Sequence, residues 1–152
     1  MEIELRLNGE AVRLAIDPQD LLLDVLRDRL GLTGAKRSCD VQVCGACTVL
    51  LDGEPVSACC TLAYEAGGRE VLTVEGLADR PEFAALEETF IRRTALQCGY
   101  CTPGMLLTIS ALLRAGELAD DEEVVRRALA GNVCRCTGYR AIVDAARELA
   151  AR

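Results

Sequence analysis

The sequence has no histidine among its 152 residues. Without imidazole, the chain has no Rieske iron–sulfur centre, no HExxH zinc site, no haem bound through histidine and no catalytic triad with a histidine base. Aromatic residues are also few, with two phenylalanines and three tyrosines, and the formal net charge is −7. This composition argues against nucleic acid as a partner. A phosphate-binding glycine loop and an evident acid–base pair are absent too, so we expect no substrate turnover from this chain alone.

The pattern of a secretory signal or a membrane span is missing as well. Residues 1–13 alternate charged and apolar side chains and lack the apolar block of a signal peptide. The longest uncharged stretch, Thr94–Leu113, contains a glutamine, two cysteines, a proline and two glycines, so we interpret it as a buried loop and helix. Nine cysteines without a signal peptide indicate a cytoplasmic protein whose thiols bind metal.

Short strands are predicted for the first half of the chain and helices for the second. Strand patterns occur at residues 2–7, 12–16, 48–51, around 56 and at 71–74, with helix patterns at 82–93, 105–115, 120–130 and 140–151. Asn8-Gly9 predicts a hairpin turn, and Asp17-Pro18 is expected to open a helix that ends near Gly31. Glu75–Pro81 has the composition of a linker.

The first cysteine group lies on a loop rich in small residues. Cys39, Cys44 and Cys47, followed by Cys59, have the C-x4-C-x2-C spacing of plant-type [2Fe–2S] proteins, with a shorter interval to the fourth cysteine. Gly45 and the adjacent alanine let the backbone approach a cluster closely. A zinc knuckle, or a run of small buried cysteines, is the alternative interpretation.

Cys60 directly follows Cys59 and competes with it for the same role. Adjacent side chains generally point in different directions, so only one of the two is expected to reach a cluster. We predict that Cys59 is the ligand and that Cys60 is buried as a small apolar side chain.

The second group consists of two cysteine pairs, each just ahead of a predicted helix. Thr102 after the first pair and Thr137 after the second are candidate N-caps, with Pro103 at the first helical position. Two helix N-termini would favour an anionic centre between them. The pairs are Cys98 with Cys101 and Cys134 with Cys136. Spacing alone leaves zinc and iron–sulfur open, but a neighbouring ferredoxin-type motif would give a second cluster a use.

Three segments resemble the small iron–sulfur subunit of the molybdenum hydroxylases, which include xanthine dehydrogenase, aldehyde oxidoreductase and aerobic carbon monoxide dehydrogenase. They are Gly-Ala-Cys-Thr-Val (45–49), Gln-Cys-Gly-Tyr-Cys-Thr-Pro-Gly-Met (97–105) and Gly-Asn-Val-Cys-Arg-Cys-Thr-Gly-Tyr (131–139). The similarity covers essentially the whole chain. It implies an α+β fold in which an N-terminal β-grasp plant-type ferredoxin domain (1–76) precedes a C-terminal four-helix-bundle domain (77–152).

The resemblance also implies ligands and partners. One [2Fe–2S] cluster would bind Cys39, Cys44, Cys47 and Cys59, and a second would bind Cys98, Cys101, Cys134 and Cys136. In the family the second cluster lies beside the molybdopterin of a large subunit, close to the residues matching Gln97 and Cys136. The first lies toward the FAD of a medium subunit. The expected assembly is a dimer of heterotrimers that passes electrons from molybdenum to flavin.

One residue departs from the family pattern. Many members have glycine three residues after the first ligand, where this chain has Gln42, so the loop backbone is expected to differ while the ligands are kept. The sequence leaves the substrate open. A free two-cluster ferredoxin and a structural zinc protein remain as alternative functions. Stable association with larger subunits would distinguish a hydroxylase subunit from a free ferredoxin.

Overall fold

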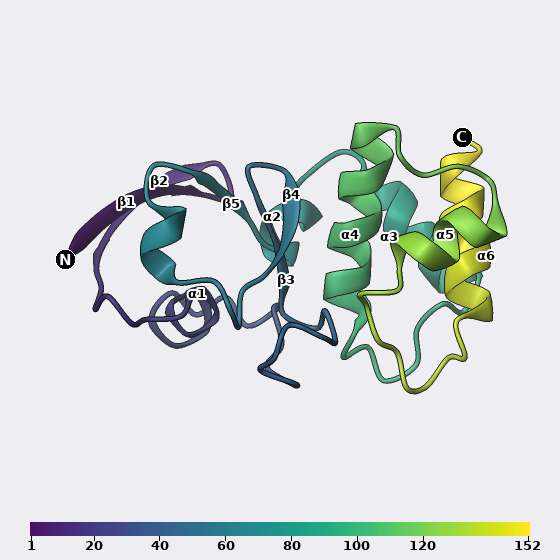
Figure 1. Cartoon of the computed structure of the whole chain (residues 1–152). Helices are drawn as coiled ribbons and strands as arrows, with labels where there is room; N and C mark the ends of the chain where they lie inside the picture. Colours follow the sequence, from purple (N-terminus) through teal and green to yellow (C-terminus); the bar gives the residue numbers. More distant parts are fainter.

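Five strands form one mixed sheet in the order β2-β1-β5-β3-β4 (Figure 1). The computed structural model describes residues 1–152. The strands are β1 (Glu2–Leu7), β2 (Glu10–Ala15), β3 (Thr48–Leu51), β4 (Glu54–Ser57) and β5 (Glu70–Leu72). β1 runs parallel to β5, and the other pairs are antiparallel. The predicted Asn8-Gly9 turn is confirmed, because both residues have the positive φ of a hairpin turn (51° and 92°).

The helix after β2 begins later than predicted. α1 (Leu22–Asp24) continues into a π-helical turn at Val25–Arg29, whereas Asp17-Pro18 precedes it in a turn. The Asp17 N–H donates to Asp20 Oδ2 at 2.8 Å, and Leu21 is extended and pairs with Leu62. The local turn and the pairing of Leu21 with a segment far along the same chain therefore delay the start of the helix by about one turn.

The predicted linker at Glu75–Pro81 is wrong over its first half, because α2 (Val74–Ala78) occupies it. Leu77 is fully buried, and Thr73 ends the preceding strand by binding the Asn8 side chain through its N–H and its hydroxyl. Gly76 explains the misleading composition: a Cβ there would meet Asn8 Oδ1 at 2.3 Å. The glycine serves a close contact between segments, not chain flexibility.

All four helices predicted for the second half are present. They are α3 (Phe83–Arg92), α4 (Thr102–Ala115), α5 (Glu122–Ala128) and α6 (Arg140–Ala150). α4 is buried along most of its length, as its apolar sequence predicts. None of the helices combines the length and apolarity needed to cross a bilayer.

The sheet is covered on both faces at β3 and β5, whereas one face of β1 is exposed. Alternate residues of β3 and β5 divide between two cores, since successive strand side chains point to opposite faces. Val49, Leu51 and Val71 pack with α1, whereas Leu50 and Leu72 belong to the core built by the helices. α4 lies against β3 at the middle of the elongated molecule, with α3, α5 and α6 beyond it (Figure 1).

Glu148 on α6 joins two helices electrostatically. Its carboxylate binds Arg92, Arg93 at 2.8 Å and Arg152 at 3.1 Å, and the hydrogen bond from Arg92 is the largest influence lowering its pKa to about 2. A carboxyl with a lowered pKa stabilises the fold above its unfolded pKa of about 4.5 and loses that effect as the pH falls toward 2.

We therefore expect Glu148→Gln to lower the urea midpoint of unfolding at pH 7. The difference from the parent protein should shrink between pH 4.5 and pH 2 as the parent carboxylate becomes protonated. It should also shrink in 1 M salt, because the three arginine side chains are exposed and salt screens their attraction to the carboxylate. Glu123→Gln, which removes an exposed pair within α5 only, is the matched control. A midpoint difference that is independent of pH and salt would contradict this role.

Candidate metal centres

The first cysteine group lies on the loop between the π-helical turn and β3. The N–H groups of Val43 and Cys44 each donate to Cys39 Sγ at 3.4 Å. The pKa of Cys39 is lowered to about 6, mainly by the backbone N–H of Val41 and then by those of Val43 and Cys44. Inward-pointing N–H groups stabilise negative charge on sulfur, which is what a thiolate ligand of a metal requires.

Cys47 and Cys59 complete this group from the sheet side. Cys47 directly precedes β3, Cys59 follows β4, and both are buried. Burial, the largest influence, raises the pKa of Cys47 to about 12, and its thiol interacts with Cys59 and Cys44. The structure therefore links the four predicted cysteines in pairs, Cys39 with Cys44 and Cys47 with both Cys44 and Cys59, through thiols of a kind that suits a metal–sulfur centre. No three side chains of the metal-binding types converge closely enough to hold a single metal ion.

The prediction that Cys60 is buried is wrong, because the side chain is exposed. Its Sγ lies 3.6 Å from Cys59 Sγ and 3.9 Å from the Asp40 carbonyl oxygen. Cys59 turns into the core between the sheet and the loop, so the next residue in the chain turns toward solvent.

Gln42 takes the backbone conformation that glycine would favour, with φ of 59°. A left-handed conformation costs a residue with a Cβ about 1–2 kcal/mol, while glycine loses more entropy on folding by about 0.5–1 kcal/mol. We therefore expect Gln42→Gly to stabilise the cluster-loaded protein by up to about 1 kcal/mol in thermal unfolding. Val43→Gly, in the same loop without a positive φ, should not stabilise it. Destabilisation by Gln42→Gly would show that the side chain itself supports the loop.

The second group consists of an exposed pair and a more buried pair of sulfurs. Cys98 and Cys136 are exposed, with their Sγ atoms 3.5 Å apart. Cys101 and Cys134 interact through their side chains, and burial is the main reason that the pKa of Cys101 rises to about 12. Electrostatic interactions of Cys101 with Cys98 and of Cys136 with Cys134 link the two pairs. The four predicted cysteines are thus linked pairwise to one another beside the start of α4.

Both predicted N-caps are wrong. Cys101 itself occupies the cap position of α4 and Thr102 is its first residue, while Tyr139, with φ of 68°, occupies the cap position of α6. Thr137 instead donates its hydroxyl to Cys134 Sγ at 3.1 Å. Burial, the largest influence on Cys134, raises its pKa, but hydrogen bonds from Thr137 and from nearby backbone leave the pKa below its usual value.

The loops that carry the two cysteine groups are hydrogen-bonded to each other. The Val133 N–H donates to the Cys44 carbonyl oxygen at 2.8 Å, and the Tyr100 hydroxyl donates to the Arg37 carbonyl oxygen. Asn132, which is buried, donates to the Gly45 carbonyl oxygen at 3.3 Å. Sequence reasoning missed these residues as contacts, because no local pattern indicates a partner more than sixty positions away.

Close packing makes this junction sensitive to added atoms. A Cβ on Gly45 would lie 2.4 Å from the Gly131 carbonyl oxygen, and one on Gly104 would lie 2.2 Å from the Gly45 carbonyl oxygen. The sequence predicted that Gly45 allows a close backbone approach. The approach that the structure shows is to the second cysteine loop and to α4.

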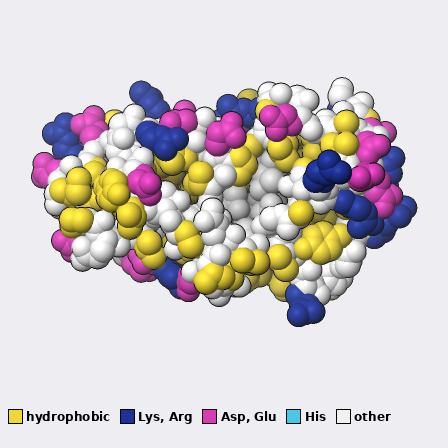
Figure 2. Space-filling view, in the orientation of Figure 1, with side chains coloured by type: hydrophobic (Ala, Val, Ile, Leu, Met, Phe, Trp, Pro, Cys, Tyr) yellow, Lys and Arg dark blue, Asp and Glu magenta, His cyan; other side chains and the backbone are white.

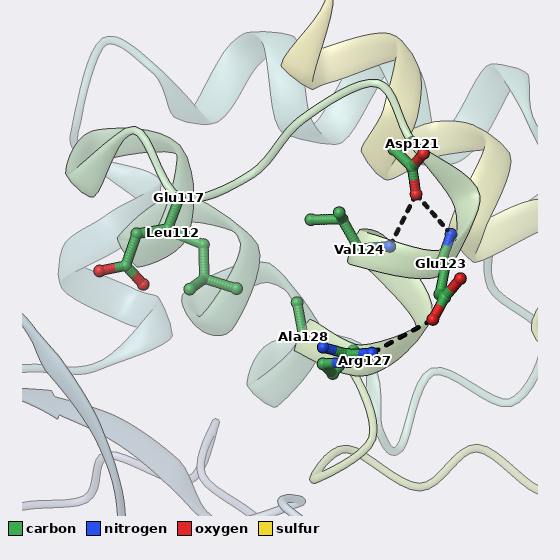
Figure 3. Close-up of a pocket in the computed structure, with 7 residues that line it drawn as sticks. All are labelled: Leu112, Glu117, Asp121, Glu123, Val124, Arg127 and Ala128. Atoms are coloured by element: carbon green, nitrogen blue, oxygen red, sulfur yellow. Dashed lines mark hydrogen bonds and ion pairs between the residues drawn. The ribbon is translucent and has the colours of Figure 1, made fainter.

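A separate hollow of about 560 Å³ lies between α4 and α5, and Figure 3 shows its lining. Asp121 caps α5 by accepting hydrogen bonds from the N–H groups of Glu123 and Val124, and Arg127 is paired with Glu123. The lining residues are Leu112, Glu117, Asp121, Glu123, Val124, Arg127 and Ala128. No cysteine is among them, so this hollow is distinct from the two thiol clusters.

Two family models match the chain in succession. The model of a 2Fe-2S iron-sulfur cluster binding domain matches residues 5–73, and that of a [2Fe-2S] binding domain matches residues 73–147. The nicotinate dehydrogenase small FeS subunit of Eubacterium barkeri is 47% identical over 145 residues, which is 95% of this chain and 92% of that protein. The aldehyde oxidoreductase iron-sulfur-binding subunit PaoA of Escherichia coli K12 is 38% identical, over 98% of this chain and 73% of its own.

Solved structures agree with these relatives. Quinoline 2-oxidoreductase from Pseudomonas putida 86 superposes with a TM-score of 0.92 at 44% identity, over 99% of this chain and 94% of that one. The aldehyde oxidoreductase of Desulfovibrio gigas superposes with a TM-score of 0.90 at 37% identity, over 99% of this chain but 17% of its own longer chain. The chain therefore belongs to the family of small [2Fe–2S] subunits of the molybdenum hydroxylases.

Proposed function

We propose that this chain is the electron-transfer subunit of a multi-subunit molybdenum hydroxylase. In this role it carries electrons from a molybdopterin centre through two [2Fe–2S] clusters to FAD, with the molybdopterin and the flavin on partner subunits. The observation that supports this most directly is the 2.8 Å hydrogen bond from the Val133 N–H to the Cys44 carbonyl oxygen. It links the backbone beside one group of four thiols to the backbone of the other. A [2Fe–2S] cluster supplies one-electron redox chemistry when bound.

The cysteines are assigned as ligands in pairs. Two sulfurs at about 2.3 Å from one tetrahedral metal are about 3.8 Å apart. The 3.5 Å separation of the Cys98 and Cys136 sulfurs is close to this value. The side chains of Cys101 and Cys134 form the second interacting pair. We assign the bundle cluster to these two pairs. The ferredoxin-like cluster is assigned to Cys39 with Cys44 and Cys47 with Cys59.

The exposed pair gives the bundle cluster a direction. Cys98 and Cys136 are exposed, and so is Gln97 directly before Cys98. We assign this side to the molybdopterin of the large subunit, with Gln97 and Cys136 nearest the pterin. Cys134, by contrast, is buried and directly follows Val133, which contacts the first cysteine group. Electrons would then enter at the exposed pair and leave toward the first group and the FAD of the medium subunit.

Exposed apolar residues support a partner at the cysteine loops. Val41 and Val43 are 65% and 61% exposed, and Tyr100 and Val133 are 47% and 46% exposed. Figure 2 shows apolar side chains along the lower middle of the molecule, where Figure 1 places these loops. Apolar groups that surround a redox centre are suited to a protein interface that excludes water.

We assign residues 1–76 to a β-grasp ferredoxin domain and residues 77–152 to a four-helix-bundle domain. The succession of the two matching family models near residue 73 supports this division. The assembly proposed is a dimer of heterotrimers located in the cytoplasm.

Copurification from the source organism tests the function. We expect this chain to elute with a large and a medium subunit, with about four iron and four acid-labile sulfide per chain for two [2Fe–2S] clusters. A monomer that retains both clusters would favour the alternative, a free-standing two-cluster ferredoxin. Zinc without acid-labile sulfide would exclude both iron–sulfur functions.

A further inference from the structure

Thr137 makes two hydrogen bonds that fix the direction of its hydroxyl proton. Its Oγ1 lies 3.1 Å from Cys134 Sγ, and the Tyr139 N–H donates to the same Oγ1 at 3.2 Å. A hydroxyl has a single proton and two lone pairs. Because one lone pair is already used by the Tyr139 N–H, and a metal-bound thiolate has no proton to donate, the hydroxyl proton points at the sulfur.

Tyr139 holds this loop in place from the other side. Its hydroxyl donates to the Asn132 carbonyl oxygen at 3.0 Å and accepts from the Cys134 N–H at 2.9 Å. Its own backbone has φ of 68°, a conformation that is unfavourable for a residue with a side chain and is kept here by the hydrogen bonds around it. The Thr137 hydroxyl is therefore oriented in advance, before any change in charge at the sulfur.

The bond lies where electrostatic effects are strong. Cys134 is 9% exposed, whereas the paired sulfurs of Cys98 and Cys136 are exposed. A dipole near a buried charge acts through a lower effective dielectric than one in water. Cys134 also adjoins Val133, whose N–H reaches the first cysteine group.

We propose that Thr137 is a positioning residue that raises the reduction potential of the bundle cluster. This rests on the proposed function, because it requires Cys134 to be a ligand of that cluster. One-electron reduction adds one negative charge to the centre, and an O–H dipole directed at a ligand sulfur stabilises the reduced form more than the oxidised form. A hydrogen bond to a charged group contributes about 1.5 kcal/mol, or about tenfold in the equilibrium between the two forms.

Redox titration of the purified complex, followed by electron paramagnetic resonance, tests the proposal. Thr137→Val keeps the shape of the side chain and removes the hydroxyl. The ratio of reduced to oxidised bundle cluster at a given potential should fall about tenfold, which corresponds to a midpoint lower by about 59 mV for one electron. Thr137→Ser should restore the parent midpoint. The midpoint of the ferredoxin-like cluster should not change in either variant.

An unchanged midpoint in Thr137→Val, with the cluster present, would overturn the proposal. Thr137→Ala serves as the second variant if Thr137→Val does not assemble. If both variants lack the bundle cluster while Thr137→Ser keeps it, Thr137 is required for cluster assembly, and the tuning role is also overturned. Iron and sulfide analysis of Cys134→Ser tests the ligand assignment separately from the role of Thr137. This variant should lose the bundle cluster. If Cys134→Ser kept the iron and sulfide of both clusters, the proposed ligand set would be contradicted, and not only the role of Thr137.

Discussion

Replacement of Cys59 by serine is expected to remove the ferredoxin-like cluster, whereas replacement of Cys60 leaves both clusters in place. Cys59 is buried and interacts with Cys47, while Cys60 is exposed. A serine hydroxyl is a poor substitute for a thiolate toward iron. The Cys59→Ser complex should therefore contain about half the iron of the parent, because one of two clusters is absent. Electron delivery from the molybdenum centre to the flavin should be abolished.

Iron analysis and electron paramagnetic resonance of the reduced complex measure both effects. Cys60→Ser is the matched control, since it makes the same chemical change at the adjacent residue. The 3.6 Å separation of the two sulfurs makes ligand exchange the competing outcome. A full iron content with an altered signal in Cys59→Ser would mean that Cys60 replaces it. The double variant would then lose the cluster. Loss of the cluster in Cys60→Ser alone would overturn the assignment of Cys59.

Gly104→Ala is expected to destabilise the protein strongly at the junction between the two cysteine groups. Alanine favours a helix over glycine by about 1 kcal/mol, so the substitution would be stabilising on a free helix surface. At Gly104 the added Cβ would lie 2.2 Å from the Gly45 carbonyl oxygen, which is backbone and cannot rotate away. Either α4 or the first cysteine loop must move. Overpacking of this kind costs about 1–3 kcal/mol and occasionally more.

Gly131→Ala provides the matched control for this substitution. Gly131 lies beside the same junction, its φ is not positive, and a Cβ there would meet no atom within 4 Å. Its effect on stability should stay within about 0.5 kcal/mol. Thermal unfolding and iron release of the two variants give the comparison. Equal stability of Gly104→Ala and Gly131→Ala would contradict the close packing of α4 against the loop.

The sequence was sufficient for the features that depend on local spacing. The hairpin at Asn8-Gly9 and the apolar helix α4 follow from periodicity and turn chemistry, and the structure confirms them. The cysteine groups were recognised because metal-ligand spacing is local within each half of a site. The grouping of Cys98 and Cys101 with Cys134 and Cys136 came from the helix starts predicted after each pair, and the family resemblance implied that the four bind one [2Fe–2S] cluster.

The errors occurred where a distant segment decides the local structure. Gly76 resembles a linker residue until the Asn8 side chain is seen to pack against it. Thr137 has the composition of an N-cap, but the αL conformation of Tyr139 moves the helix start and leaves the hydroxyl facing a sulfur. Asn132 has no local signal at all, because its partner lies 87 residues earlier in the chain.

The division of the sheet between two cores affects how the protein is made on the ribosome. Chains emerge from the N-terminus at about 5–20 residues per second, and early segments fold first. Leu50 and Leu72 belong to the core built by the helices, so one face of the sheet stays uncovered until Thr102–Ala115 has been synthesised. The first cysteine loop likewise lacks its contacts with Asn132 until the last part of the chain emerges. We therefore expect iron to be inserted into a completed polypeptide, and nascent chains to need protection from aggregation until then.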